Sequence, residues 1–554
     1  MKRFNIKRWI SLGIIGCFLI GLSACGSNSN STGNTTISGE ATAASASVDE
    51  DTLYVGVGNY TDLTKIDTIE GYSYELNSVL NNVVETLFYY DEDSIAQPLL
   101  VDSYTESEDG TVYVFELKDY ITFSDGTNLT AEDVVFSLER HRDADNASLL
   151  AWMFESVDTI EATDEYEVTV TLSTPDAMFL NTLCTPAGGI VSKAYYEEHE
   201  EDFGTVSGGI VGSGPYEITS WTSGEEVILQ TYDGYWNAEN TDIDFTTVDV
   251  IYYADSNVVT QALEAGQLDY SGYISDENAK ELEECDTVTV RSTDTGASIF
   301  LSFNNSVEPF DDVNVRKAIS YAIDKETIVE QIIGEKYSAV GTSLPFSDVL
   351  VSTQAEYFEG FFDSLNTYEY DVDTAKEYLS KSSVPDGFEF TLKYHSGDSG
   401  MESMALLIQQ NLADIGITVD LEAISTSEWT TLRYGGSETR DYEAMITLWG
   451  TDYPDPVGVV LPMYYSTNNV AGGSNWAEYV NSTFDALMDA QAAELDVSAR
   501  AELLKEALYI LDDEVPAAPL YIKYSQTALS DRVEYTSTTM QLYNVYFKDF
   551  KKAS

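Results

Sequence analysis

The chain has 554 residues, 43% of them hydrophobic, and its 95 acidic and 27 basic side chains give a formal net charge of −68. This charge excludes proteins that bind phosphate backbones through basic surfaces, and an anionic membrane surface would also repel the chain. The length predicts three or four units of ordinary domain size, and the hydrophobic content excludes a disordered protein. The acidic surplus is typical of a solvated exterior that keeps an extracellular protein soluble.

The N-terminus is typical of an exported protein. Four basic residues among the first eight precede an apolar run over residues 9–22, which is too short for a comfortable transmembrane helix. The run ends in Leu-Ser-Ala-Cys-Gly, which is similar to the bacterial lipobox. That resemblance implies a lipoprotein signal peptide over residues 1–24 and a diacylglyceryl thioether on Cys25. We therefore expect a lipid anchor that holds the chain on the extracytoplasmic face of the cell membrane.

Residues 25–50 predict a flexible linker, because they are rich in Ser, Asn, Thr, Gly and Ala and almost lack large apolar side chains. Once the signal peptide is removed and Cys25 is lipidated, Cys184 and Cys285 remain. Export permits a disulfide between them. Their distance along the chain gives no geometric support for a bridge, and two buried free thiols are the favoured alternative.

The first half of the folded chain alternates between strand and helix patterns. Leu53, Val55 and Val57 alternate with polar neighbours, which predicts a half-buried strand. Residues 130–133 resemble a capping box and predict the start of a helix. The remaining patterns predict a helix over 79–87, strands over 111–117, 121–123 and 167–172, and a hairpin with strands over 216–221 and 227–232.

The second half continues the alternation without a short repeat. Asp311 and Asp312 predict a helix start, Asp324 a restart and Gly334 a stop. A strand over 388–394, a helix over 401–414 and a strand over 417–421 form a strand–helix–strand unit. Further patterns predict a strand over 444–448, a helix over 498–511 and a strand over 516–522. The class predicted is α/β with sizeable mixed sheets.

Residues 448–456 stand out because they follow the apolar run over 444–448 directly. Ligand groups usually gather where a strand ends and a loop begins. Here that place holds a tryptophan, a glycine that exposes backbone, and carboxylates in a loop stiffened by prolines. An anionic side chain in this position suits a cationic ligand group, such as the terminal amine of a peptide. The alternative is a plain strand-to-turn corner in which Asp455 forms the turn between two prolines.

Four motifs, taken in order along about 52–524, resemble the family 5 extracellular solute-binding proteins, which are the peptide, dipeptide and nickel receptors of ABC importers. An ordered set of this kind is far more specific than a single motif. The motifs are residues 113–138, residues 212–216 together with 233–236, residues 314–319, and residues 449–456.

The resemblance implies a two-lobed α/β fold like that of periplasmic binding proteins, of class II type, with mixed sheets and a hinge between the lobes. Lobe I is expected over 51–300, with an inserted subdomain near 86–207, and lobe II over 301–515. Residues 516–554 would return to lobe I. The implied protein is a monomer without a cofactor that captures short peptides in the interlobe cleft and delivers them to ABC permease subunits.

The resemblance also implies the residues of the site. Asp452 aligns with the family's acidic residue that binds the α-amine of a peptide, and we expect it to be ionised at neutral pH. Trp449, Gly450 and Thr451 fit the strand edge that pairs with the ligand backbone. The other implied contacts are Trp429, as an aromatic wall of the side-chain pockets, and Tyr72 and Ser73 on the opposing lobe.

One departure from the family pattern concerns the ligand carboxylate. A well-known oligopeptide receptor of the family has an arginine three residues before the tryptophan, where this chain has Ile446. Carboxylate recognition would then come from elsewhere, and Arg433 and Arg440 are the candidates. Peptide length and terminus preference stay open.

Other functions have weaker support in the sequence. Gly-x-Ser-x-Gly, Ser-x-x-Lys, His-Glu-x-x-His, P-loop and Cys-x-x-Cys motifs are all absent, and the three histidines are widely spaced. We therefore predict no catalytic residues and no metal ligands, which leaves an exported hydrolase as a weak alternative. Receptors of the same fold for an oligosaccharide, chelated nickel or a signalling peptide stay open, although a neutral sugar would gain little from Asp452.

Overall fold

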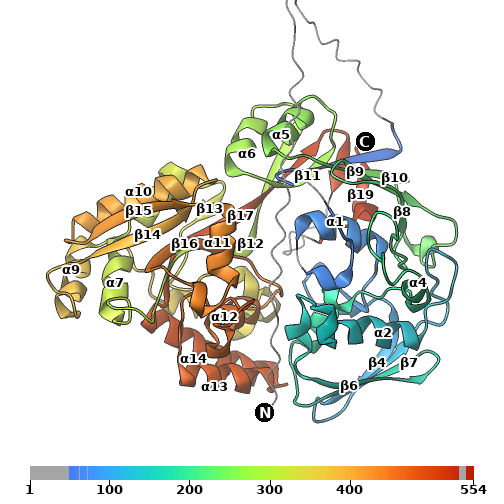
Figure 1. Ribbon diagram of the computed structural model, residues 1–554, viewed down its shortest axis with the longest axis horizontal. Helices are drawn as coiled ribbons and strands as arrows, with labels where there is room; N and C mark the ends of the chain where they lie inside the picture. Colours follow the sequence, from blue (N-terminus) through green and yellow to red (C-terminus); the bar gives the residue numbers. More distant parts are fainter. Residues whose placement is uncertain (1–48, 61–62, 72, 536–543) are drawn as a thin grey trace, which may run out of the picture. The chain divides into compact units, whose positions relative to one another are not determined.

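The computed structural model describes residues 49–60, 63–71, 73–535 and 544–554, all of which belong to one compact unit. Most of its strands join one mixed sheet (Figure 1). The sheet has 11 strands in the order β15-β14-β16-β12-β17-β11-β1-β10-β9-β8, with β13 paired to β17. These strands are β1 (Thr52–Val57), β8 (Tyr216–Thr222), β9 (Glu226–Thr231), β10 (Thr247–Tyr252), β11 (Tyr270–Ile274), β12 (Val288–Phe303), β13 (Ser338–Ala339), β14 (Glu389–His395), β15 (Thr418–Ile424), β16 (Ala444–Trp449) and β17 (Ala517–Ser530).

Two long strands connect the two ends of this sheet. β12 has 16 residues and β17 has 14, and they pair antiparallel along almost their whole length. β11 flanks β17 at one end of the pair, and β16 flanks β12 at the other. The register of the β12–β17 pair shifts between Asp294 and Ser298 of β12. There Gly296 has a φ of 74°, and a Cβ on it would lie 2.6 Å from the Leu350 side chain, so the irregularity requires glycine.

The strands at the β11 end pack on helix α1 (Tyr74–Val83). The helix begins at Ser73, whose hydroxyl accepts the backbone N–H of Leu76 at 3.2 Å. Its apolar face, with Val79 and Leu80, shares a core with the inward side chains of β1 and β10. The predicted helix over 79–87 is therefore partly correct, because the helix starts earlier and ends at Val83, where Val84 adopts an extended conformation.

Residues 88–172 form two smaller sheets of their own. A hairpin joins β2 (Phe88–Tyr90) to β3 (Ala96–Pro98). A four-stranded antiparallel sheet follows in the order β4 (Val101–Glu106), β5 (Val112–Leu117), β7 (Glu167–Leu172) and β6 (Val157–Asp164), with helix α2 (Ala131–Arg142) packed on it. Thr130 and Asp133 form the predicted capping box of α2. The predicted strand over 121–123 is wrong, because only an isolated bridge between Thr122 and Asn128 forms there.

The strands at the β16 end are covered by helices whose ends match the sequence signals. Asp312 caps α7 (Val313–Ala322), Asp324 caps α8 (Lys325–Thr327), and Gly334 follows at a φ of 114°. The strand–helix–strand unit is confirmed: α10 (Ser399–Ala413) links the parallel strands β14 and β15. The other helices of this part are α9 (Val372–Lys381), α11 (Thr426–Tyr434), α12 (Val457–Tyr464), α13 (Ser482–Ala492) and α14 (Val497–Glu514).

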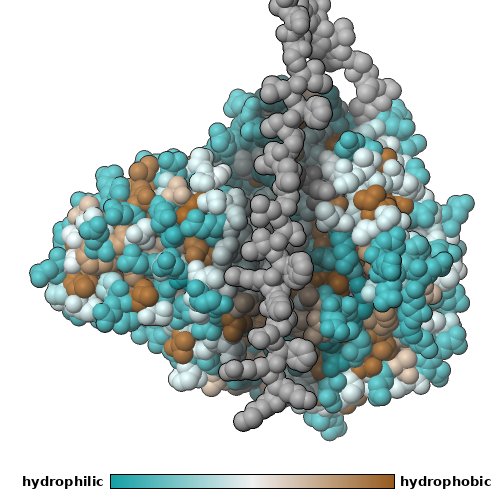
Figure 2. Space-filling view, in the orientation of Figure 1, coloured by the Kyte–Doolittle hydropathy of each residue, from teal (hydrophilic) through white to brown (hydrophobic). Residues whose placement is uncertain are grey.

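The surface in view in Figure 2 is mostly polar, and the described cysteines are not paired. The face drawn in Figure 2 is mostly hydrophilic in its described part, with apolar side chains scattered over it. Both described cysteines are free thiols; Cys184 is buried and Cys285 is half-buried, so no disulfide joins them. Across residues 49–60, 63–71, 73–535 and 544–554, no helix combines the length and the apolar character needed to cross a membrane.

Candidate functional site

The candidate site begins where β16 loses one of its two neighbours. β16 pairs with β12 along its whole length, but it pairs with β14 only at Ala444 and Met445. Beyond Met445, two side chains of α11 donate hydrogen bonds to the backbone carbonyls on the unpaired edge of β16. Trp429 donates its Nε1–H to the Ile446 carbonyl at 3.4 Å, and Arg433 donates from Nη2 to the Leu448 carbonyl at 3.3 Å. The strand end is thus bordered by side chains rather than by another strand.

The loop after β16 places an open backbone position next to a half-buried carboxyl. Gly450 is exposed, and a Cβ built on it would meet nothing within 4 Å. The buried Thr451 hydroxyl hydrogen-bonds the Tyr453 backbone, accepting its N–H at 3.1 Å and donating to its carbonyl, which fixes the turn. Asp452 lies between these groups and is half-buried.

Burial changes the charge state that we expected for Asp452. Removing water from the carboxylate penalises its ionised form, which raises the pKa of Asp452 from its ordinary value of 3.8 to about 7. The sequence predicted an ionised carboxylate at neutral pH, and burial makes this carboxyl only partly ionised there. A carboxyl with this pKa gains charge readily when a cation arrives, which is typical of a functional site.

Arg500 and Gln354 fix the far end of the loop by binding Asp455. The Asp455 carboxylate accepts two hydrogen bonds from Arg500 of α14, at 2.8 and 3.0 Å, and one from Gln354 at 3.0 Å. It also accepts the Val457 N–H at 2.9 Å, at the start of α12. Asp455 is buried, so this bidentate pair is a firm attachment. The sequence identified Asp455 as a turn residue but gave no sign that Arg500 pairs with it.

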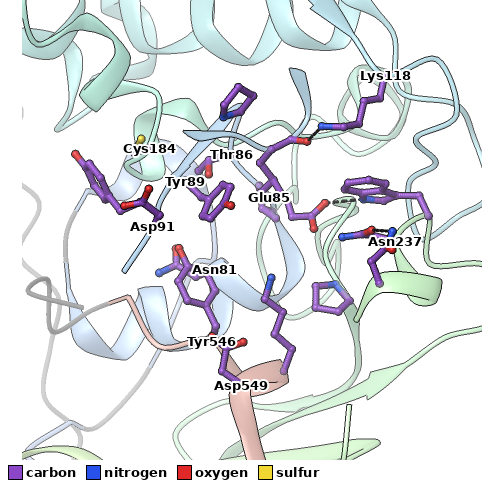
Figure 3. A pocket seen from close by; sticks show the side chains of 18 of the residues that line it. Asn81, Glu85, Thr86, Tyr89, Asp91, Lys118, Cys184, Asn237, Tyr546 and Asp549 are labelled. Carbon is purple, nitrogen blue, oxygen red and sulfur yellow. Dashed lines mark hydrogen bonds between the residues drawn. The ribbon is translucent and has the colours of Figure 1, made fainter. Parts of the chain in front are cut away.

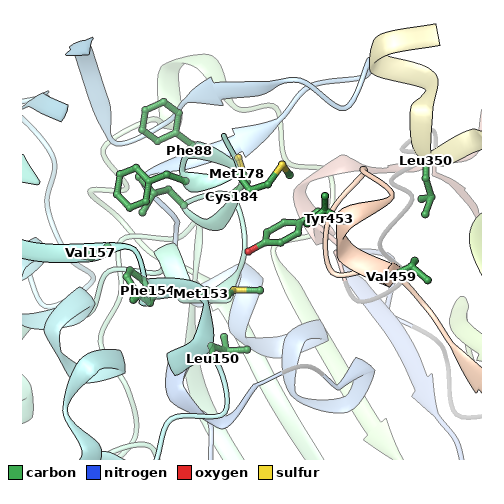
Figure 4. Close-up of a cluster of buried hydrophobic side chains, with 14 of the residues drawn as sticks. Phe88, Leu150, Met153, Phe154, Val157, Met178, Cys184, Leu350, Tyr453 and Val459 are labelled. Atoms are coloured by element: carbon green, nitrogen blue, oxygen red, sulfur yellow. The ribbon is translucent and has the colours of Figure 1, made fainter. Parts of the chain in front are cut away.

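Tyr453 connects the same loop to two segments, one that precedes β6 and one that follows β7. Its hydroxyl lies 3.0 Å from the Thr182 hydroxyl, and its ring meets Trp152 edge to face at 6.1 Å. The ring lies in one apolar cluster with Met153 and Met178 (Figure 4). Asp452 is therefore flanked on its C-terminal side by a residue that contacts another part of the fold.

The structure brings the predicted residues of β16 and its loop together and gives two of their side chains supporting contacts. Trp449 is half-buried, donates Nε1–H to the Gly458 carbonyl at 3.1 Å and packs edge to face on Trp476 at 5.3 Å. Trp429 is half-buried and contacts β16 through Ile446. Ser73 caps α1. Tyr72 and Cys25 lie outside the described residues.

A cavity of about 700 Å³ lies elsewhere, and none of the predicted site residues lines it (Figure 3). Its buried carboxyl, Glu85, accepts hydrogen bonds from Ser213 at 2.9 Å, Tyr235 at 2.8 Å and Trp236 at 2.7 Å. Burial raises the pKa of Glu85 despite these donors and the nearby Lys548. Three donors from two separate segments make Glu85 a structural crosslink. In the described part of the chain, no three His, Cys, Asp or Glu side chains gather to hold a metal ion.

The raised pKa of Asp452 predicts a stability effect with a defined sign. Because the folded state holds this proton more tightly than the unfolded chain does, the carboxyl destabilises the ligand-free protein progressively as the pH rises from about 4 through 7. We expect Asp452→Asn to raise the free energy of unfolding by on the order of 2 kcal/mol at pH 8, and by little at pH 4. Urea unfolding at both pH values measures this difference.

The matched control is Asp441→Asn, which removes an exposed carboxylate from the same region. It should leave the free energy of unfolding nearly unchanged at both pH values. A parent and an Asp452→Asn variant of equal stability at pH 8 would show that Asp452 is not desolvated.

The sequence and the fold were compared with known proteins. Residues 96–471 match the model for "Bacterial extracellular solute-binding proteins, family 5 Middle". The chain is 28% identical over 473 residues to the glutathione-binding protein GsiB of Escherichia coli O6:K15:H31, which covers 85% of this chain and 89% of that protein.

Solved structures agree with the fold. The binding protein AgaA from A. tumefaciens R10, in complex with agropinic acid, is 25% identical with a TM-score of 0.73, covering 91% of this chain and 99% of AgaA. DppA from Helicobacter pylori, in complex with the peptide STSA, is 24% identical with a TM-score of 0.75, covering 91% and 98%. The predicted fold class, a two-lobed α/β binding protein, is confirmed.

Proposed function

The chain belongs to the bacterial extracellular solute-binding proteins of family 5, and from that premise we propose that it captures short peptides with a free α-amine at the loop after β16. Proteins of this family are the substrate-binding components of ABC importers: they bind small ligands and work with permease subunits. The observation that carries the peptide proposal is the half-buried carboxyl of Asp452, with a pKa near 7, beside open backbone at Gly450.

The chemistry of the loop suits an ammonium group followed by a peptide backbone. An arriving ammonium stabilises the ionised form of Asp452 and so recovers the free energy that burial costs the ligand-free protein. The open side of Gly450 leaves room for the ligand backbone to approach the main chain. Main-chain hydrogen bonds give affinity without selecting side chains, so binding would tolerate many sequences. Trp449 and Thr451 contribute backbone here, since their side chains hold the loop.

The other predicted contacts belong to the same proposal. Trp429 would form an aromatic wall for ligand side chains, and Tyr72 and Ser73 would meet the ligand from lobe I. We assign lobe I to 51–300 and 516–554, and lobe II to 301–515, so that β12 and β17 connect them. Closure of the lobes over the ligand is a population shift, driven by the better contacts of the closed state.

Glutathione is the second candidate ligand, favoured by the similarity to GsiB. It carries a free α-amine that Asp452 could bind, but it joins its first two residues through the side chain of glutamate. The solved relatives bind different solutes, agropinic acid in one and a peptide in the other. Native mass spectrometry of the freshly purified protein would identify the ligand that co-purifies. An oligosaccharide or a nickel chelate in that spectrum would overturn the peptide proposal.

The role of Asp452 predicts a loss of affinity when its charge is removed. We expect Asp452→Ala to weaken binding of trialanine about 100-fold, because one partner of a buried charge pair is lost. N-acetyl-trialanine, which lacks the ammonium, should bind poorly to the parent protein. Isothermal titration calorimetry measures both, with Asp441→Ala as the control for an exposed carboxylate on the same lobe. Equal affinity for the acetylated and free peptides would assign Asp452 another role.

The pKa of Asp452 also predicts the pH dependence of binding. Below pH 7 the carboxyl must release its proton before it can pair with an ammonium, so the affinity for trialanine should fall by up to about tenfold for each pH unit. Above about pH 8 the α-amine itself loses its proton, and the affinity should fall again. We expect a maximum near pH 7–8 in calorimetric titrations. In Asp452→Ala the fall in affinity below pH 7 should disappear. An unchanged fall would show that another group titrates.

We also propose that a lipid on Cys25 holds the chain at the extracytoplasmic face of the membrane, with residues 25–50 as a flexible tether. The support is the sequence of the N-terminus, and two or more acyl chains anchor a protein far better than one. Cys25→Ala, expressed in a bacterial host that lipidates exported proteins, should abolish labelling by radioactive palmitate and move the chain from the membrane fraction to the soluble fraction. Membrane retention of the variant at the parental level would contradict the anchor.

A further inference from the structure

Of the two candidate arginines, Arg440 uses both terminal nitrogens of its guanidinium within the protein. Its guanidinium pairs with Glu478 at 2.7 Å. It also donates to the backbone carbonyls of Asn475 at 2.9 Å, Gly473 at 2.9 Å and Arg433 at 3.2 Å, and its side chain is completely buried. The four N–H groups of its two terminal nitrogens are used in this way, and only the buried Nε has no partner. Arg440 therefore stabilises the loops behind the site.

Arg433 has a different environment. It lies on α11, one turn after Trp429, and its guanidinium sits between two tryptophan rings, 4.1 Å from the centre of Trp429 and 4.2 Å from that of Trp476. Its one hydrogen bond to a described residue is the 3.3 Å contact from Nη2 to the Leu448 carbonyl. Nε is buried without a partner. The Tyr434 ring is a third aromatic neighbour at 5.0 Å, so aromatic rings make up much of the surroundings of this guanidinium.

The charge of Arg433 is also not balanced locally. Among the residues that the structure describes, no acidic side chain forms an ion pair with it. Burial lowers the pKa of Arg433 to about 10, and only the weak influence of Tyr434 opposes this shift. A buried cation normally has a carboxylate partner, because removing the charge from water is costly. Here the aromatic rings supply part of the compensation, and the guanidinium keeps donors that no described residue uses.

We propose that Arg433 receives a carboxylate of the ligand, which makes the ligand class a short peptide or peptide-like acid with a free carboxylate. This inference rests on the proposed function, in which Asp452 binds the amine at the other end. Leu448, which Arg433 contacts, lies four residues before Asp452, so the Cα atoms of the two are at most about 14 Å apart. That limit suits a ligand of two or three residues. Arg433 would thus replace the arginine that the family pattern places at position 446.

The simpler role for Arg433 is support of the two tryptophan rings, and the test has to separate the two roles. Four proteins are compared: the parent, Arg433→Gln, Arg433→Lys, and Lys376→Gln, which removes one exposed positive charge from α9. Each is titrated calorimetrically with trialanine and with trialanine amide, whose C-terminus carries no charge. Thermal unfolding and tryptophan fluorescence verify that each variant is folded.

We expect the parent and Lys376→Gln to bind trialanine at least about tenfold more tightly than its amide. Arg433→Gln should lose about 10- to 100-fold in affinity for trialanine and change little for the amide. Arg433→Lys should fall between them, since it keeps the charge without the planar fork. If Arg433→Gln does not fold, the preference of the parent for the free acid and its reduction in Arg433→Lys decide the question.

The outcomes distinguish the inference from the function on which it rests. Equal losses for both peptides in Arg433→Gln, or a parent that binds acid and amide alike, would reduce Arg433 to a support for the tryptophans while peptide binding stands. Failure of the parent to bind trialanine, trialanine amide and glutathione would overturn the peptide proposal and the role of Arg433 with it.

Discussion

The site depends on one constraint, the fixed course of the loop that leaves β16. The bidentate pair between Asp455 and Arg500 attaches the far end of this loop to α14. The short turn between Thr451 and Tyr453 sets the orientation of the residue between them. Asp452 is therefore held in a partly desolvated position that a free loop would not maintain, because an unconstrained carboxylate would turn toward water.

The fixed loop keeps Asp452 partly buried, and this burial of an ionisable group lowers the stability of the folded protein. The ligand-free protein keeps a carboxyl with a pKa near 7 at the loop and a guanidinium between two indole rings in the neighbouring helix. The pKa of each group is shifted toward its neutral form by burial, and the ionised forms of the two groups have opposite charge. Binding sites often retain such groups because the ligand supplies the missing partners. A ligand with an amine and a carboxylate would compensate both at once.

Much of the fold could be predicted from the sequence because the relevant signals are local. The capping box at Thr130 and the glycine stop at Gly334 lie where the structure has them. The strand before Trp449 was predicted from its apolar run. The prediction of a strand over 121–123 is wrong, because a short segment with apolar residues at both ends forms a strand only if another strand lies beside it.

The electrostatic state of the site could not be predicted in this way. The sequence places Asp452 at a strand end, but its pKa depends on burial by residues distant in the chain. Likewise, Arg433 and Arg440 are equivalent candidates in the sequence. Only the contacts with Glu478 and with Trp476, each more than 35 residues further along, separate a structural guanidinium from an available one. Long-range pairing of this kind leaves no periodic trace in a single sequence.

The position of β17 in the sheet has a consequence for biosynthesis. This strand lies between β11 and β12, yet it is among the last segments that the ribosome makes. The centre of the large sheet therefore cannot be completed until nearly the whole chain has been translated. For a chain that crosses a membrane unfolded, an architecture whose central strand is made last delays folding before export.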